Sequence, residues 1–117
     1  MYRVDAYQHA MDRVEADGAI GVSIQWLIDE RAGAPNFAMR RFVIEPGGNT
    51  PFHQHDWEHE VYVLRGRGLL VTDEGEREIG PDIALLIGAN ERHQLCALPE
   101  GSLDFLCMVP NGPATVH

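Results

Sequence analysis

Short apolar runs separated by turns marked with glycine or proline recur along the whole chain. The run Ile20–Ile28 alternates apolar residues with others at a period of two, which is the pattern of a half-buried strand. Similar runs follow, with a turn predicted at Pro46–Gly48, and no segment has a convincing helical period. About eight to ten short strands at this spacing predict an all-β sandwich or barrel. The further expected strands are 37–45, 52–55, 59–65, 69–72, 77–79, 83–87, 92–97 and 103–109.

The length of the chain, 117 residues, fits one domain with one core. We expect residues 1–19 to form an N-terminal arm or edge strand, 20–110 to form the β-barrel, and 111–117 to form a C-terminal tail. Proline and glycine residues after position 109 end the regular pattern.

The charge balance limits the classes of partner. The net charge is −9 and all nine basic residues are arginines, which argues against nucleic acid or an anionic membrane surface. No apolar run reaches the length of a membrane span, and the N-terminus lacks a basic-then-apolar signal pattern, so we expect a cytoplasmic protein. Cys96 and Cys107 lie too far apart for a CxxC motif and are expected to be reduced thiols.

Histidines are concentrated in one stretch of the chain. His53, His55 and His59 fall within seven consecutive positions, and His93 opens a later strand-like run. In an extended segment, residues two apart point to the same face, so His53 and His55 can face one ion. Imidazole is the commonest protein ligand for transition metals. This spacing predicts a mononuclear metal site, whereas His9 and His117 are interpreted as structural or solvated.

The segments around these histidines resemble the two sequence motifs of the cupin superfamily. Gly47, His53-x-His55 and Gly66 match the first motif, and 80–82 with 88–93 resemble the second. The chain is more similar still to a subgroup of small, single-domain, manganese-type cupins with four histidine ligands. Further segments that carry this resemblance are 34–40, 57–61 and 105–107.

The first motif departs from the family pattern at one informative position. Cupins usually carry a glutamate where this chain has His59, and Glu58 and Glu60 are one residue out of phase. The resemblance therefore implies His53, His55, His59 and His93 as metal ligands. It also implies a double-stranded β-helix (jelly roll) and a homodimer that exchanges N-terminal strands.

The donor set limits the choice of ion. An all-histidine site suits Mn, Fe, Co, Ni, Cu or Zn rather than Ca or Mg, and the resemblance favours Mn. A six-coordinate ion with four histidines keeps two positions open for substrate or dioxygen, whereas a structural zinc site is closed. We therefore expect a catalytic or substrate-binding divalent metal ion.

Strand parity gives candidates for the substrate pocket. If Asp104 faces outward, Phe105 and Cys107 face the interior. Arg40 and Phe42 share one face, so Arg40 is either an anchor for an anionic substrate or a barrel-end residue paired with an acid. Trp57 follows the histidine pair and is a candidate cover for the mouth. No catalytic nucleophile or carboxylate pair can be identified.

These observations leave three functions open. The first is a metal-dependent dioxygenase or other oxidoreductase acting on a small organic molecule. The second is a metal-dependent isomerase or lyase that uses the ion as a Lewis acid, and the third is a non-enzymatic cupin that binds a small ligand. Each requires a small-molecule partner.

Overall fold

The fold of this chain is a single antiparallel sheet that curls into a barrel. A computed structural model describes residues 1–115, and His117 and the end of the predicted tail lie outside them. The described part contains nine strands and three short 3₁₀ turns, which confirms the all-β expectation. The strands are β1 Asp12–Arg13, β2 Ile20–Ile28, β3 Phe37–Asn49, β4 His59–Arg65, β5 Gly68–Thr72, β6 Gly75–Ile79, β7 Ala84–Ile87, β8 His93–Ala97 and β9 Leu103–Pro110, and the turns are η1 Ala6–Gln8, η2 Glu30–Ala32 and η3 Pro113–Thr115.

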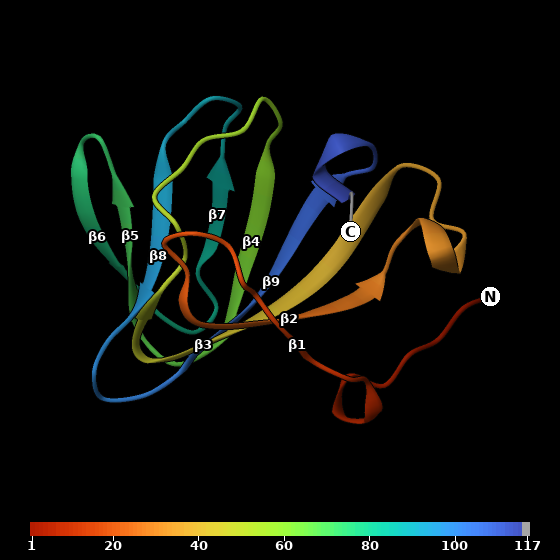
Figure 1. The fold of residues 1–117 in the computed structure, drawn as a ribbon, viewed down its shortest axis with the longest axis horizontal. Helices are drawn as coiled ribbons and strands as arrows, with labels where there is room; N and C mark the ends of the chain where they lie inside the picture. The colour runs from red at the N-terminus through yellow and green to blue at the C-terminus, as the bar shows by residue number, and fades with distance from the viewer. Residues whose placement is uncertain (116–117) are drawn as a thin grey trace.

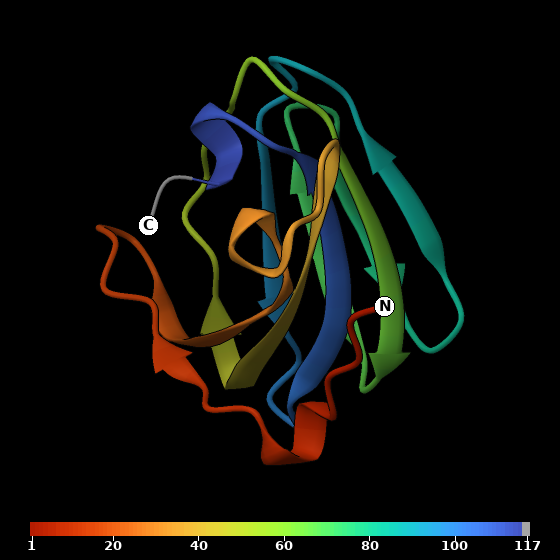
Figure 2. The same cartoon turned by 90° about the vertical axis from the view of Figure 1, so that its right-hand side faces the viewer.

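The sheet runs in the order β6-β5-β8-β3-β9-β4-β7, and β2 adds to β3 on one side with β1 beyond it. Strands β6, β5 and β8 form one wall, while β2, β3 and β9 form a wall that faces it (Figure 1). A view turned by 90° shows how strongly β3 and β9 bend around the interior (Figure 2). None of the 3₁₀ turns in residues 1–115 has the length and apolar character needed to cross a bilayer.

Alternation along β4 and β9 fixes which side chains enter the barrel. His59, Val61 and Val63 are buried, and the residues between them are exposed, as the period of two predicts. On β9 the inward residues pair in register with β3, so that Phe105 lies opposite Phe42. The buried apolar core is Val22, Ala38, Ile44, Val61, Val63, Ile79, Ile87, Leu95, Ala97, Leu103, Phe105, Cys107 and Val109.

Two local predictions are wrong. The expected turn at Pro46–Gly48 is part of β3, which continues to Asn49 through an irregularity opposite Ile20–Val22. Gly47 supplies the required positive φ of 76°, and a Cβ on Gly48 would clash with the backbone of Ile20. The expected strand at 52–55 is a loop that joins the sheet only through an isolated bridge between His53 and His93.

Asp104 faces away from the barrel interior as predicted, but it is covered rather than exposed. Its side chain points away from the barrel interior, as parity requires, but it is only 8% exposed. The guanidinium of Arg41 donates two hydrogen bonds to it, at 2.8 and 2.7 Å, and Arg65 donates a third at 3.2 Å. Gln25 accepts from Arg41 at 3.0 Å and donates to the carbonyls of Ala6 and His9, which covers this network with the N-terminal segment.

Removing the carboxylate of Asp104 should destabilise the barrel. In Asp104→Ala the partly buried Arg41 loses its counter-charge, so the free energy of unfolding should fall by about 3 kcal/mol. Chemical denaturation measures this loss. The matched control is Asp73→Ala, which breaks an exposed ion pair to Arg92 and should cost less than about 1 kcal/mol. Equal losses in the two variants would contradict the assignment of a buried network.

Candidate metal centre and substrate cavity

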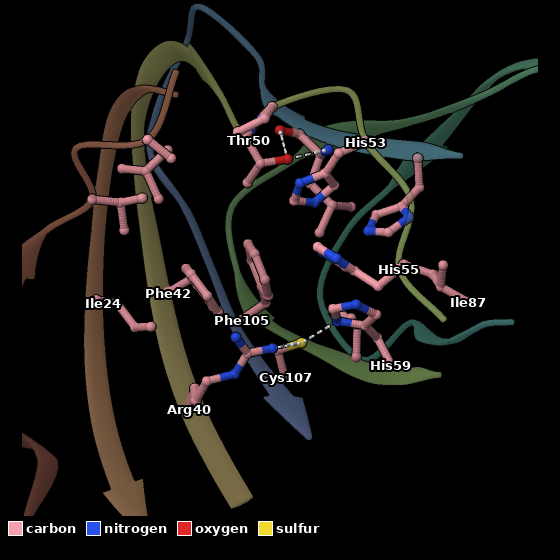
Figure 3. Close-up of a pocket in the computed structure, with 17 residues that line it drawn as sticks. Ile24, Arg40, Phe42, Thr50, His53, His55, His59, Ile87, Phe105 and Cys107 are labelled. Carbon is pink, nitrogen blue, oxygen red and sulfur yellow. Dashed lines mark hydrogen bonds between the residues drawn. The ribbon is translucent and has the colours of Figure 1, made fainter. Parts of the chain in front are cut away.

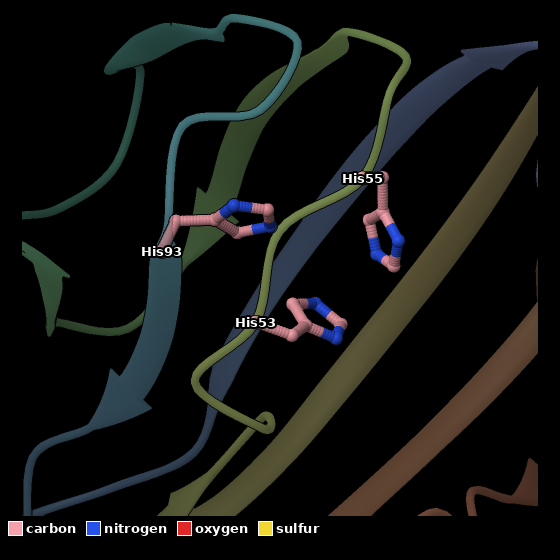
Figure 4. Close-up of side chains that lie close together, drawn as sticks. All are labelled: His53, His55 and His93. Atoms are coloured by element: carbon pink, nitrogen blue, oxygen red, sulfur yellow. The ribbon is translucent and has the colours of Figure 1, made fainter.

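Three histidines from two segments meet inside the barrel. The rings of His53, His55 and His93 point toward one another, the first two from the loop after β3 and the third from the start of β8 (Figure 4). One ring nitrogen of each lies within 4.8 Å of the others. Reciprocal backbone hydrogen bonds between His53 and His93, at 3.1 and 2.8 Å, fix the loop to the strand.

His59 borders this group from β4. Its ring centroid lies 5.1 Å from that of His93 and 5.3 Å from that of His55, but its nitrogens fall outside the compact set of three. Its Nδ1 contacts the Cys107 sulfur at 3.3 Å, and its buried Nε2 has no hydrogen-bond partner. A buried polar atom without a partner is costly, so this nitrogen suits a ligand that the chain itself does not supply.

Burial keeps the rings of His53, His55 and His59 neutral, which is the form that binds a metal. Burial lowers the pKa of His53 to about 4, and His55 and His93 add to this effect. Burial also lowers the pKa of His59 to about 3, with Arg40 as the next cause. Burial, followed by His93 and Arg40, lowers the pKa of His55. Neutral imidazoles with a shared free space therefore fit a divalent transition metal ion.

Neighbouring residues restrain the ligand rings. The indole of Trp57 stacks on His55 with the ring planes 4° apart and the centroids 4.5 Å apart. The backbone carbonyl of Glu91 lies 2.8 Å from Nδ1 of His93, which leaves Nε2 of His93 to face the cluster. Partners of this kind hold metal ligands in the orientation that binding requires.

A cavity of about 350 Å³ opens directly beside the histidines. This volume is in the range of small-molecule sites. Phe42 and Phe105 stack in it with centroids 5.3 Å apart, and the guanidinium of Arg40 lies below them (Figure 3). The lining comprises Val14, Ala16, Val22, Ile24, Arg40, Phe42, Thr50, Pro51, His53, His55, His59, Val61, Ile87, His93, Leu95, Phe105 and Cys107.

The structure brings most of the sequence-predicted site residues to this cavity. Arg40, Phe42, Phe105 and Cys107 line it, together with all four histidines. Trp57 is the exception: its ring stacks on His55 and packs against the hydrophobic core, and it does not line the cavity. Sequence reasoning missed the contribution of Val14 and Ala16, since their segment has only a weak periodic pattern.

Comparisons with known proteins agree with this architecture. A polyketide cyclase, RemF from Streptomyces resistomycificus, superposes with a TM-score of 0.92 at 37% identity over 96% of this chain and 80% of its own. A cupin-2 domain from Rhodospirillum rubrum gives a TM-score of 0.80 at 26% identity over 96% of this chain and 74% of its own.

A curated relative matches a shorter stretch. It is the 1-methylthio-D-xylulose 5-phosphate methylsulfurylase of Rhodospirillum rubrum, 32% identical over 71 residues, which are 61% of this chain. The match spans only 46% of the length of that relative.

A family model gives the assignment. The model described as "Cupin domain" matches residues 40–109, a stretch that contains the four inward-facing histidines and most of the curled sheet. Since this match spans more than half of the chain, the chain belongs to the cupin family.

Proposed function

We propose that this cupin is a metal-dependent cyclase that closes a ring in a small substrate with several carbonyl groups. The observation that carries the proposal is a cluster of four histidines that opens onto a largely apolar cavity and is not sealed by protein. Similarity to the polyketide cyclase over 96% of the chain supports the reaction class.

Four histidines would hold the ion. His53, His55 and His93 are the closest group, and His59 would contribute the Nε2 that has no partner within the described chain. When bound, a divalent transition metal with open coordination positions supplies Lewis acidity to a carbonyl oxygen. Manganese stays the expected metal from the family resemblance, and zinc or iron fits the same donors.

The other lining residues orient the substrate and exclude water. The stacked rings of Phe42 and Phe105 provide a flat apolar wall against which a conjugated substrate can pack. Val22, Ile24 and Leu95 contribute further apolar lining. A flexible substrate held against this wall would be folded so that its two reacting ends approach each other. This lowers the entropic cost of closing the ring.

A dioxygenase-type oxidation is the second candidate. It is favoured by the donor set, since an all-imidazole site suits redox-active Fe or Mn as well as Zn. An apolar cavity beside the site is also compatible with an oxygen-dependent reaction on an enol. The two candidates differ in their need for oxygen and for a redox-active metal.

Anaerobic turnover separates these candidates. We expect protein loaded with redox-inert Zn to convert acyclic 1,3,5-triketones, tested with and without a terminal carboxylate, to ring-closed, dehydrated products without oxygen, as followed by mass spectrometry. The metal-free protein and His55→Ala are the controls and should give no product above background. Turnover that requires oxygen together with Fe or Mn would replace the cyclase by the dioxygenase. Absence of product under every condition would exclude both.

A further inference from the structure

Arg40 carries a charge inside the cavity that the metal site does not use. The residue is 9% exposed, and it lines the cavity from β3. Its guanidinium carbon lies 5.5 Å from the ring centroid of Trp26 and 5.0 Å from that of Phe42. These rings stabilise a cation from the side but supply no negative charge.

The polar partners of Arg40 are incomplete. One terminal nitrogen donates to the Cys107 sulfur at 3.0 Å, and the buried Nε has no hydrogen-bond partner. None of the ion pairs found among residues 1–115 includes Arg40. The adjacent Arg41, on the opposite face of the same strand, is instead paired with Asp104 at 2.7 Å. An isolated buried charge is costly, so the position of Arg40 calls for an anion from outside the chain.

The charge balance of the cavity leads to the same conclusion. None of the described residues that line it is acidic. A bound divalent ion would add two positive charges to that of Arg40. We infer that the substrate of this cavity is a carboxylate and that Arg40 binds its anionic end. The inference rests on the proposed function, because it takes the cavity to be the substrate site.

The lining favours a carboxylate over a phosphate. A guanidinium matches the two oxygens of a carboxylate with two parallel hydrogen bonds. A phosphate usually draws on several donors, such as backbone N–H groups at a helix N-terminus or further basic side chains. Arg40 is the only arginine or lysine in the described lining, and apart from the four histidines, Thr50 and Cys107 the other lining residues are apolar.

Binding of matched probes tests this inference. We use 2-naphthoate, the neutral 2-naphthamide of the same shape, and 2-naphthyl phosphate, with affinities measured by calorimetry on the metal-free protein. The wild type should bind 2-naphthoate at least tenfold more tightly than 2-naphthamide and more tightly than the phosphate. Arg40→Met should bring the ratio of naphthoate to naphthamide affinity close to one, with the affinity for naphthamide changed less than twofold.

Three further variants make the result decisive. Arg40→Lys keeps the charge and should retain part of the preference for the carboxylate, and Arg40→Gln serves if Arg40→Met does not fold. Arg92→Met removes an exposed arginine that stacks on Phe52 and should leave the ratio unchanged. Equal affinities for naphthoate and naphthamide in the wild type, tighter binding of the phosphate, or an unchanged ratio in Arg40→Met and Arg40→Gln would overturn the inference.

The same measurements separate this inference from the proposed function. A preference for naphthoate that depends on Arg40, in a protein without metal-dependent turnover, supports the anion site and rejects the cyclase. Turnover of triketones by a protein that binds both probes equally rejects only the role of Arg40.

Discussion

Replacing His55 with alanine should abolish stoichiometric metal binding while the barrel stays folded. Its ring is one of the three whose nitrogens lie within 4.8 Å of one another, so removing it breaks the compact ligand group. The side chain is only partly buried, on a loop outside the regular strands, so its loss removes little core packing. We expect metal content per chain to fall from about one to near zero, a loss of more than about 100-fold in affinity, since even indirect partners of metal ligands contribute 10–100-fold.

Elemental analysis of purified, dialysed protein measures this loss, and circular dichroism checks the fold. His9→Ala is the matched control, because His9 lies outside the cluster and, among the described contacts, its ring hydrogen-bonds only to the neighbouring backbone carbonyl of Ala10. Metal content should stay at the wild-type level in this control. Full metal content in His55→Ala would reject the ligand set.

A parallel variant measures how much the fourth histidine, His59, contributes to metal affinity. In His59→Ala we expect weaker binding rather than none, because the nitrogens of His59 lie outside the closest group. An undiminished affinity in His59→Ala would show that the site uses three histidines only.

Much of the fold could be predicted from the sequence because alternation and turn residues are local signals. β2 and β4 have the predicted bounds, and the remaining predicted strands that form differ by one or two residues, apart from the extension of β3. The exceptions depend on contacts between distant segments. β3 passes through Pro46–Gly48 because its partner β2 tolerates an irregularity there, and no local pattern encodes this.

Strand parity could predict which side chains of the candidate site face the barrel interior, where those residues lie on strands. His59 and Cys107 face inward on β4 and β9, and parity placed both on that face. Strand parity predicted that Arg40 shares a face of its strand with Phe42, but it could not predict whether an acidic residue pairs with Arg40. The structure shows that the neighbouring acid, Asp104, pairs with Arg41 on the outer face, because β3 and β9 run antiparallel with Phe42 opposite Phe105.

The orientation of Trp57 and the covering of Asp104 were not predictable from local patterns. Trp57 lies in a loop, where alternation does not apply, and its ring packs against His55. Asp104 is buried because the N-terminal segment, held by Gln25, lies over the outer face of the sheet. Strand parity distinguishes the inner face of a strand from its outer face, but it does not predict which part of the outer face another segment of the chain covers.

The metal-free protein should lose stability as the pH falls below about 6.5. An unfolded histidine takes up a proton near its ordinary pKa of 6.5, whereas the folded pKa values of His53 and His59 are about 4 and about 3. Between these values the unfolded state binds more protons, so the free energy of unfolding decreases with decreasing pH. The stabilising contribution is complete above about pH 6.5 and is lost progressively toward the folded pKa values.

The expected size of this effect is set by the two largest shifts. After allowance for solvent screening at the partly buried His53, we expect a loss of roughly 3 kcal/mol between pH 7 and pH 4. Denaturant unfolding at a series of pH values, with a chelator present, measures it. Replacing both residues, by His53→Gln and His59→Gln, should remove most of the slope, because glutamine does not titrate.

A control variant separates the pH dependence that comes from His53 and His59 from that of histidines elsewhere in the protein. His9→Gln removes a histidine outside the cavity and should leave the pH dependence as it is in the wild type. Carboxylates titrate in the same range and contribute to every variant equally, so the difference between the double variant and the wild type reports on His53 and His59 alone. A double variant with the wild-type slope would mean that these rings are not held neutral by burial, and the electrostatic basis of the metal centre would fail with it.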